Sequence, residues 1–428
     1  MGLKIIHTSD WHLGKKLFKI DRLDEQKLFL DWLSDFIISS GIDILLVSGD
    51  VFDSPTPSNE SVKIYFDFLK NLSMKSKCLT YIIAGNHDSG KFLEAPKEIL
   101  KDLKVLVCGK LAWTEQNVLS PEHKATLKYN DFEINLVLIP YFRSHEILNL
   151  NSLTFDAQEN TQENNQSDNF GIHNRFDQLF KNLLPNKTPN QFNILLLHHL
   201  LEGYELSGSE QIIHLSGIDG FKKKLFAPYF DYVALGHIHK TMNFKSDQCQ
   251  ICYCGAPLKY RFDEFNQKHI TLLTLDYQNQ TIQSQKELIP VPTFRDILSI
   301  KINPSNFEEV INQIVKTNQP YQLSPIIEAV LLLDLPDAKL TQTIKEMLVK
   351  HNIENFILYT EFSKDLEETP LPTLNEFNDY ELTDLFHLFY KEKFSGVNQI
   401  DTKILDSFKE LLISSHDQQN DNEAQDLS

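Results

Sequence analysis

The residues of this chain best suited to chemistry are polar side chains that end short apolar stretches. Five such stretches stop at Asp, Asn or His, as buried strands that deliver side chains to a shared site would. One stretch ends at Gly236 and is followed by His237 and His239, which would face the same side of an extended backbone. Gly236 would let the backbone approach that site closely. The candidate metal ligands are Asp10, His12, Asp50, Asn86, His198, His237 and His239.

This set combines carboxylates, imidazoles and an amide oxygen, which suits Mn²⁺, Fe or Zn²⁺ better than Ca²⁺ or a thiolate-bound metal. Seven ligands are too many for one tetrahedral ion, but they fit two ions if a carboxylate bridges them. Two ions about 3.5–4 Å apart can clamp the attacking and leaving oxygens of a phosphoryl group. Taken singly, Asp10 or Asp50 could be a helix N-cap and Asn86 a turn residue, but together the seven favour one site.

The elements that must position these residues begin in β-α-β-α-β order, which predicts a largely parallel sheet with helices on its faces. Ligands bind beyond the carboxyl ends of the strands in such sheets, so the polar residues should gather at one edge. The predicted strands are 3–9, 42–48, 79–84, 105–108, 125–129, 132–141, 194–197 and several between 232 and 289, and the helices are 21–39, 59–74 and 174–184.

Two domain boundaries follow these elements, one marked by Pro290 and Pro292 and the other by Pro370 and Pro372. A polar stretch before them, residues 151–170, is rich in Asn, Gln, Asp and Glu and is predicted to be a surface loop. The predicted parts are a first domain (1–289), a small α+β capping domain (290–370), a segment of two amphipathic helices (371–416, with helices 375–394 and 401–414) and a disordered tail (417–428).

The composition is that of an ordinary globular protein, with 41% hydrophobic and 23% charged residues. No apolar run approaches the ~20 residues that a membrane span needs, and no signal-peptide pattern precedes the first strand. We therefore expect a cytoplasmic protein. The net charge of −18 means that any contact with nucleic acid must be local, helped by metal ions or supplied by a partner.

The five cysteines are predicted to be reduced thiols, since their number is odd and no signal peptide is apparent. Cys249, Cys252 and Cys254 could be read as part of a zinc site. A structural zinc needs four ligands and no second Cys pair follows, so we interpret them as small strand residues.

The motifs D-x-H, G-D-x-x-D, G-N-H-D, a strand-terminal His and G-H-x-H, in that order, resemble the calcineurin-like metallophosphoesterase superfamily. The resemblance narrows to the SbcD family, the nuclease subunits of bacterial SbcCD complexes, and covers residues 1–275 by motif. It implies an α/β fold, a four-layered α-β-β-α metallophosphoesterase sandwich, followed by the capping domain and the helical segment. The motifs that carry it are His7-Thr-Ser-Asp-Trp-His-Leu-Gly14, Gly49-Asp-Val-Phe-Asp53, Ala84-Gly-Asn-His-Asp-Ser89, Ala234-Leu-Gly-His-Ile-His239 and Tyr253-Cys-Gly-Ala-Pro257.

The resemblance also implies a division of ligands between two metals, with Asp50 bridging them. His198 is preferred to its neighbour His199 because it lies five residues before Gly203, which fits the family spacing. One metal would take Asp10, His12 and His239, and the other would take Asn86, His198 and His237.

His87 would contact the scissile phosphate or protonate the leaving 3′ oxygen rather than bind metal. The alternative is a hydrogen bond to Asp53 or Asp10 that only orients the site. Family members from archaea and eukaryotes carry His at the position of Asp53, whereas bacterial SbcD-like chains carry Asp, so this difference is not a sign of lost function.

The implied function is that of a Mn²⁺-dependent DNA nuclease in repair, recombination and replication. It would be a 3′→5′ exonuclease on double-stranded ends and an endonuclease on single strands and hairpins. No Walker A motif occurs here, so ATP hydrolysis would come from an SbcC partner bound through residues 371–416, and the nuclease subunit would form a homodimer. The alternatives are a small-molecule or cyclic-nucleotide phosphoesterase of the same superfamily and a non-catalytic scaffold.

Basic residues that could contact DNA phosphates lie mostly in loops just after the motif residues. The run Lys222–Lys224 is better read as a solvated helix face. The main candidates are Lys15, Lys16, Arg143, Lys259 and Arg261, with Lys19, Arg22 and Lys240 as further ones.

Overall fold

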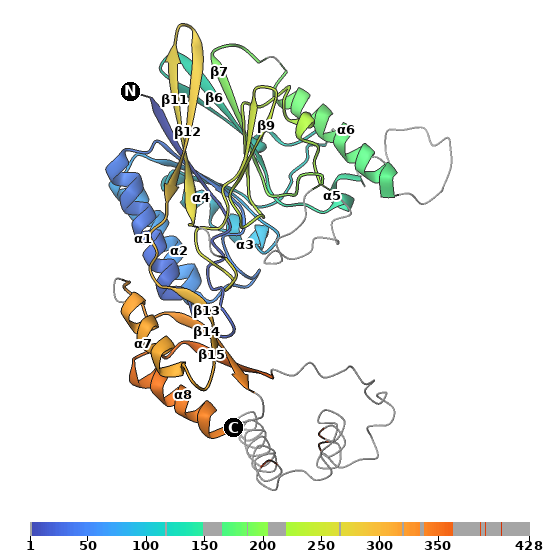
Figure 1. The fold of residues 1–428 in the computed structure, drawn as a ribbon. Coiled ribbons are helices and arrows are strands. Elements are labelled where there is room, and N and C mark those ends of the chain that lie inside the picture. Colours follow the sequence, from blue (N-terminus) through green and yellow to red (C-terminus); the bar gives the residue numbers. More distant parts are fainter. Residues whose placement is uncertain are drawn as a thin grey trace, which may run out of the picture. The chain divides into compact units, whose positions relative to one another are not determined.

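Apolar runs form the strands of three sheets, two of them in the first of two units into which the chain divides. These units are Met1–Arg295 and Asp296–Ser428. The computed structural model, drawn in Figure 1, describes residues 2–115, 118–148, 165–185, 187–203, 220–264, 267–318, 321–333 and 338–362, with Phe386, Tyr390 and Ile404.

The first sheet has the strand order β12-β11-β1-β2-β3-β4. From β1 to β4 the neighbours are parallel, whereas β11 is antiparallel to both β1 and β12. The strands are β1 (Leu3–Thr8), β2 (Ile44–Ser48), β3 (Leu79–Ile83), β4 (Val105–Cys108), β11 (His269–Gln278) and β12 (Thr281–Pro290).

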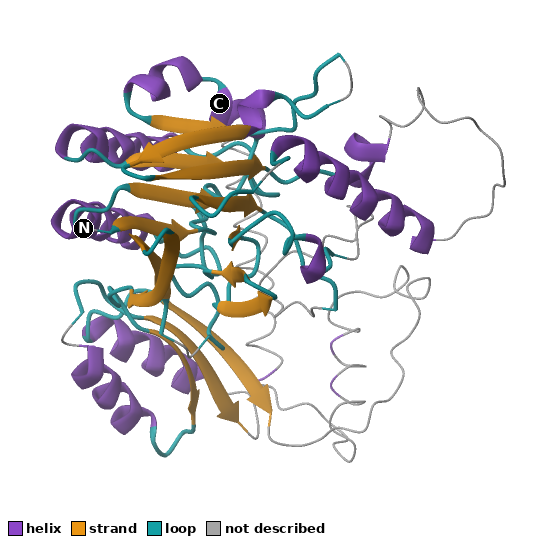
Figure 2. Ribbon diagram, turned by 90° about the horizontal axis from the view of Figure 1, so that it is seen from above, coloured by secondary structure: helices purple, strands orange, loops and turns teal. Residues whose placement is uncertain are grey.

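Helices cover the outer face of this sheet, and Figure 2 shows the two longer ones side by side. Helix α1 (Leu23–Ser40) ends at Gly41, whose φ of 62° is the left-handed conformation that glycine adopts readily. Helix α2 (Asn59–Lys75) begins where the Ser58 hydroxyl accepts a hydrogen bond from the Ser61 amide. Their apolar stripes pack on β1 and β2, while α3 (Gly90–Glu94) and α4 (Lys97–Asp102) precede β4.

The second sheet has the order β5-β6-β7-β8-β10-β9, with parallel neighbours from β6 to β10 and antiparallel strands at both edges. Helix α6 (Asn165–Leu183) packs on its outer face through Phe176 and Phe180. The other elements are β5 (Lys124–Tyr129), β6 (Phe132–Ile139), β7 (Gln191–Leu197), β8 (Tyr232–Leu235), β9 (Met242–Ser246), β10 (Cys249–Tyr253), α5 (Ser144–Leu148) and two 3-10 turns, Pro121–His123 and Lys223–Leu225.

The inner faces of the two sheets meet in a shared apolar core. Side chains of the first sheet such as Ile5 and Leu46 pack there with Leu136, Ile194 and Ala234 of the second. Helices lie outside each sheet, so the layers run α-β-β-α and the predicted four-layered sandwich is confirmed.

The second unit contains a parallel three-stranded sheet in the order β13-β14-β15. Two helices pack against it through Ile311 and Ile344, and both lie on the same face in Figures 1 and 2. The elements are β13 (Ile297–Ile302), α7 (Phe307–Asn318), β14 (Ile326–Leu333), α8 (Ala338–Lys350) and β15 (Phe356–Phe362).

Two expectations from the sequence differ from the structure. Helix α6 begins at Asn165, so the loop predicted over 151–170 is wrong in its last part, because the polar composition there is also compatible with a helix. The units divide after Arg295 rather than at 289, because β12 continues to Pro290 and both Val291 and Phe294 join the first core.

The predicted C-terminal helices, 375–394 and 401–414, and the predicted tail lie outside the described residues, except for Phe386, Tyr390 and Ile404, which are helical. Among the helices that the structure describes, none combines the length and apolarity required to cross a bilayer.

Candidate metal centre

The ends of β1 and β8 bring Asp10, His12 and His239 together in a first ligand cluster. One potential ligand atom from each of these buried residues lies within 4.8 Å of the others. The Nε2 atoms of His12 and His239 face each other at 3.1 Å, a separation suited to two ligands of one ion. The Asp10 carboxylate accepts a hydrogen bond from Ser9 and another from the backbone amide of His237.

A second ligand cluster forms where β3, β7 and β8 end, around the amide oxygen of Asn86. The Oδ1 atom of Asn86 lies 3.0 Å from His198 Nε2 and 3.0 Å from His237 Nδ1. Asp50, His198 and His237 again place one ligand atom each within 4.8 Å of the others. All four residues predicted for this side of the site therefore lie together.

Asp50 lies between the two clusters. Its Oδ2 atom is 3.6 Å from His12 Nε2 and 3.3 Å from His198 Nε2, so one carboxylate reaches both groups. Its Oδ1 atom accepts a hydrogen bond of 2.9 Å from the backbone amide of His87. This position is the one that a bridging carboxylate requires.

Four of the candidate ligands have positive φ angles, a backbone conformation that residues other than glycine rarely adopt. The φ angles are 54° at Asp10, 44° at His12, 51° at Asp50 and 90° at His237. Each such residue costs of order 1–3 kcal/mol and persists where the surrounding structure forces it, most often at functional sites. These four residues lie in the turns that carry the ligands out of β1, β2 and β8.

Three glycines allow the backbone segments of the site to approach one another. A Cβ atom at Gly236 would collide with the Ser48 carbonyl oxygen, and one at Gly85 would collide with the Asp50 carboxylate. A Cβ at Gly49 would strike the His198 ring. The close approach expected for Gly236 is therefore present, and two further motif glycines share it.

Burial keeps most of the imidazoles neutral, the form in which they bind metal. It lowers the pKa of His237 to about 3 and lowers the pKa values of His12 and His239 as well. Burial also raises the pKa of Asp10 to about 7. Burial opposes the shifts in the His198–Asp50 pair, but their mutual attraction raises the pKa of His198 to about 9 and holds that of Asp50 well below its usual range.

The residues of both clusters fit divalent cations. The donor set is imidazole, carboxylate and amide oxygen, and His237 Nε2 is buried without a hydrogen-bond partner among the described residues. Cations here would also compensate the buried Asp10 and Asp50 carboxylates, which burial otherwise disfavours as charged groups. The ligand roles of the seven residues remain predictions.

The motif residue Asp53 and two groups that sequence reasoning did not single out, Ser48 and Tyr260, support the imidazoles. The Asp53 carboxylate lies 3.3 Å from His12 Nδ1, and the Ser48 carbonyl accepts a 2.7 Å hydrogen bond from His198 Nδ1. Tyr260 is buried, and its ring lies edge-on to both His12 and His239, with centroid separations of 5.3 Å. Its hydroxyl contacts the Asp10 and Trp11 carbonyl oxygens, at 3.0 and 2.5 Å.

His87 is half-buried beside the first cluster, with its ring centroid 4.7 Å from that of His12. Its Nδ1 atom is 3.0 Å from the backbone carbonyl oxygen of Asp53. A carbonyl only accepts, so Nδ1 carries the proton in this contact and Nε2 keeps its lone pair unless the ring is charged. The orienting hydrogen bond considered from the sequence thus involves the backbone of Asp53.

His199 lies apart from the two clusters although it is adjacent to His198. It is buried, its ring stacks on Tyr141 with centroids 5.1 Å apart, and its Nε2 atom accepts a hydrogen bond from the Phe142 amide at 3.4 Å. The structure therefore positions His198, and not His199, among the candidate ligands.

The basic residues proposed for DNA contacts differ in their availability. Lys16, Lys19, Lys240 and Arg143 are exposed, and the run Lys222–Lys224 is exposed as expected. Lys259 is half-buried, Lys15 pairs with Asp53 at 2.9 Å and Arg261 pairs with Asp263 at 2.8 Å.

Arg22 was a further candidate for DNA contact, and that expectation is wrong. Its side chain is buried, pairs with Glu25 at 2.8 Å and donates a hydrogen bond to the Lys259 carbonyl. The spacing of Arg22 and Glu25, three residues apart at a helix start, was the sequence signal for this ion pair.

The cysteines take no part in the site. All five are buried free thiols, and burial raises the pKa of Cys249 to about 12. The metal-ligand groupings found among the described residues include none of them. This agrees with the interpretation of Cys249, Cys252 and Cys254 as strand residues.

Comparisons with known proteins place the chain in a family. The family described as calcineurin-like phosphoesterase matches residues 3–241, which contain all seven candidate ligands. The chain therefore belongs to the calcineurin-like phosphoesterase family, whose members are metal-dependent hydrolases that use divalent ions.

Its relatives specify the type of phosphoesterase. The chain is 30% identical to the SbcD subunit of the nuclease SbcCD of Escherichia coli K12, over 68% of this chain and 69% of the relative. It is 26% identical to the SbcD subunit of the same nuclease in Staphylococcus epidermidis, over 73% of this chain and 75% of the relative. The expected resemblance to an SbcD-type metallophosphoesterase is confirmed.

Among solved structures, a dimetal phosphatase from Danio rerio gives a TM-score of 0.37 at 8% identity, covering 68% of this chain and 99% of that one. A similarity at this level supports no inference.

Proposed function

We propose that this chain is a Mn²⁺-dependent DNA nuclease that acts in an SbcCD-type complex in DNA repair and recombination. Its activities would be 3′→5′ exonuclease on double-stranded ends and endonuclease on single strands and hairpins. The observation that carries the proposal is the pair of ligand clusters joined by Asp50, in a chain similar to two SbcCD nuclease subunits.

The proposed chemistry divides between metals and protein. Bound divalent ions would supply Lewis acidity and an activated water for phosphodiester hydrolysis. The first cluster (Asp10, His12, His239) and the second cluster (Asn86, His198, His237) would hold them, with Asp50 shared. The strained turns at Asp10 and Asp50 would fix the ligands before substrate arrives, so little reorganisation would remain for the reaction.

His87 would act on the substrate rather than on a metal. Its Nδ1 proton is engaged by the Asp53 carbonyl, which orients the ring and leaves Nε2 as the atom to face a phosphate oxygen. In its protonated form, Nε2–H would stabilise the developing negative charge or protonate the leaving 3′ oxygen. Holding one ring nitrogen at a backbone carbonyl is a common way to orient a catalytic histidine.

Substrate choice is the first test of this proposal. We expect the purified chain with Mn²⁺ to degrade labelled duplex and hairpin DNA and to leave 2′,3′- and 3′,5′-cyclic nucleotides largely intact. Efficient hydrolysis of cyclic nucleotides without any cleavage of DNA would favour the alternative, a small-molecule phosphoesterase of the same family. EDTA should abolish either activity, and added Mn²⁺ should restore it.

We also propose that the chain works with an SbcC-type ATPase, as a homodimer of the nuclease subunit and in the cytoplasm. The relatives' names specify one subunit of a two-subunit nuclease, and the acidic charge of −18 makes a partner with basic surface useful for holding DNA. The amphipathic pattern over 371–416 is the predicted contact with the ATPase coiled coil.

Deleting residues 374–428 tests the partner proposal. The shortened chain should keep its metals and Mn²⁺-dependent cleavage of short single-stranded DNA, but lose co-purification with the ATPase and any ATP stimulation. A shortened chain that still forms the complex would refute the proposed contact. Unfolding of the shortened chain would instead show that these residues pack on the capping domain.

A further inference from the structure

Strand β4, which reads Val105-Leu-Val-Cys108, forms an open edge of the first sheet and pairs only with β3 among the described strands. The carbonyl oxygens of Lys104 and Cys108 accept hydrogen bonds from Thr80 and Ala84 on the β3 side. Alternate residues of a strand turn their polar groups to opposite sides, so those of Val105 and Val107 point away from the sheet. No hydrogen bond to these outward groups occurs within the described part of the chain.

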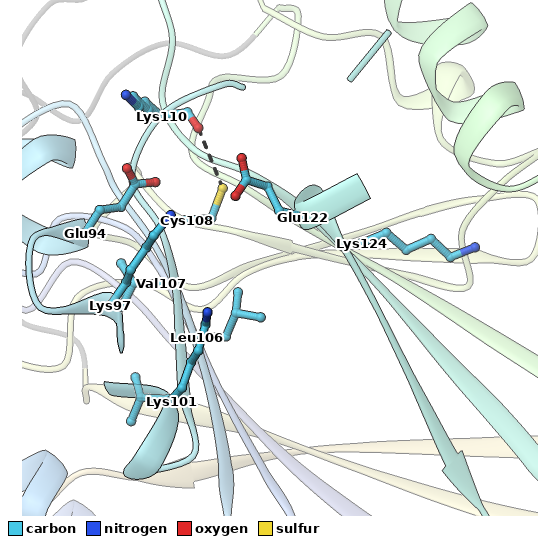
Figure 3. A pocket seen from close by; sticks show the side chains of 10 residues that line it. Glu94, Lys97, Lys101, Leu106, Val107, Cys108, Lys110, Glu122 and Lys124 are labelled. Atoms are coloured by element: carbon cyan, nitrogen blue, oxygen red, sulfur yellow. Dashed lines mark hydrogen bonds between the residues drawn. The ribbon is translucent and has the colours of Figure 1, made fainter. Parts of the chain in front are cut away.

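A cavity of about 190 Å³ runs along this edge. Figure 3 shows it with Lys97 and Lys101 reaching over the strand, whereas Lys124 points away. The lining comes from α3, α4, β4, the segment after β4, the turn before β5 and β5 itself: Glu94, Lys97, Lys101, Val105, Leu106, Val107, Cys108, Lys110, Glu122 and Lys124.

The cavity is basic although the chain as a whole is acidic, because four lysines and two glutamates line it. The Glu94 carboxylate already accepts a 2.7 Å hydrogen bond from the Gly109 amide, and Lys101 pairs with Glu98 at 2.9 Å. Lys97 and Lys110 are exposed, and neither takes part in an ion pair with any described residue. These two ammonium groups are therefore available to an incoming anion.

Lysines often protect edge strands from pairing with other chains. Here the strand itself carries no charged residue, and the lysines reach the cavity from neighbouring elements, so the backbone edge stays usable. A nucleic acid fits less well, because phosphates only accept hydrogen bonds and the edge presents carbonyl oxygens as well as amides.

We propose that β4 is a docking site for an extended acidic peptide of a partner protein, which adds to the sheet as one more strand. Backbone hydrogen bonds to Val105 and Val107 would hold the peptide, as in other strand-addition complexes. Acidic side chains at alternate positions would meet Lys97 and Lys110. This site is separate from the metal ligands and does not depend on the proposed nuclease activity.

The test uses the full chain and a fluorescein-labelled eight-residue peptide of alternating Asp and Val, with binding measured by fluorescence anisotropy. The double variant Lys97→Glu with Lys110→Glu should bind at least tenfold more weakly. The matched control, Lys27→Glu with Lys63→Glu, changes two exposed lysines on α1 and α2 and should leave binding unchanged. Thermal unfolding verifies that each variant is folded, and the milder pair Lys97→Ser with Lys110→Ser replaces the first if it is not.

Peptide N-methylation distinguishes strand addition from simple charge attraction. Methylating one set of alternate amides should abolish binding, whereas methylating the other set should leave it within about twofold, because only one set faces β4. Equal effects of the two sets would overturn the proposal. A single-stranded oligonucleotide that displaces the peptide and depends on the same lysines would also overturn it, as would the absence of any peptide binding.

Discussion

The two ligand clusters of the metal centre orient their imidazoles by different means. In the first cluster, side chains support the rings: the Asp53 carboxylate lies 3.3 Å from His12 Nδ1, and Tyr260 lies edge-on to both His12 and His239. In the second cluster, the backbone carbonyl of Ser48 accepts a 2.7 Å hydrogen bond from His198 Nδ1. Side-chain substitutions can therefore change how the histidines of the first cluster are oriented, whereas the hydrogen bond that orients His198 in the second depends on the backbone.

Asp50 is the residue that both clusters share, so its loss should have the largest effect. We expect Asp50→Ala to abolish nuclease activity and to lower the metal content below one ion per chain by elemental analysis. Asp31→Ala, which alters an exposed carboxylate on α1, serves as the control. Two bound metals in the Asp50 variant would refute a shared carboxylate.

Substitution of His87 tests whether this residue, which lies close to the first cluster, acts on the substrate and not as a metal ligand. His87→Ala should keep both metals and DNA binding but reduce turnover by ~10²–10⁴, the usual contribution of a general acid or charge stabiliser. Elemental analysis and binding to DNA in Ca²⁺ are the measurements. Loss of a metal would instead show that His87 is a metal ligand and belongs to the first cluster.

Substitutions at Asp53 and Ser48 test this difference between the clusters directly. Asp53 contacts His12 of the first cluster, and Ser48 contacts His198 of the second. Removing a carboxylate that orients a ligating histidine typically costs 10–100-fold in metal affinity, so Asp53→Ala should weaken one of two Mn²⁺ sites by about that factor. Ser48→Ala keeps the carbonyl that accepts from His198, so titration calorimetry should show two unchanged sites. Equal losses in both variants would show that the clusters do not differ in this way.

Tyr260→Phe should have the smallest effect, since it keeps the ring against His12 and His239 and removes only the hydroxyl. The Asp10 and Trp11 carbonyls would lose a partner, which costs about 1–3 kcal/mol of unfolding free energy, with a decrease below tenfold in Mn²⁺ affinity. Tyr65→Phe is the matched control, because that buried hydroxyl has no hydrogen-bond partner within the described residues. Denaturant unfolding that shows equal changes in the two variants would contradict the role assigned to Tyr260.

The candidate ligands could be predicted from the sequence because each follows an apolar run, and strand ends meet at one edge of a parallel sheet. Their supporting groups could not. Ser48 acts through its backbone, and Tyr260 is distant in sequence from the ligands that it contacts. Asp53 belongs to a recognised motif, but its contact with His12 becomes visible only once β1 and β2 are adjacent. The spacing of Arg22 and Glu25 indicates their ion pair, but the burial of Arg22 depends on packing that the sequence does not show.

Polar composition does not show where helix α6 begins. Residues from Asn165 to about 170 are rich in Asn and Gln and lack a clear apolar stripe, yet they begin helix α6. Phe176 and Phe180, further along the same helix, pack on the second sheet and supply the apolar contact that stabilises it. Composition alone could not show how far such a helix extends.

The spread of the ligands along the chain bears on how the protein is made. The first cluster joins Asp10 to His239, which lies far along the chain, and β1 lies between β2 and a strand that begins only at His269. A ribosome must therefore synthesise the whole stretch from Asp10 to His239 before this cluster can close around an ion. A chain released before residue 237 would lack His237 and His239 and so could not present the full set of candidate ligands.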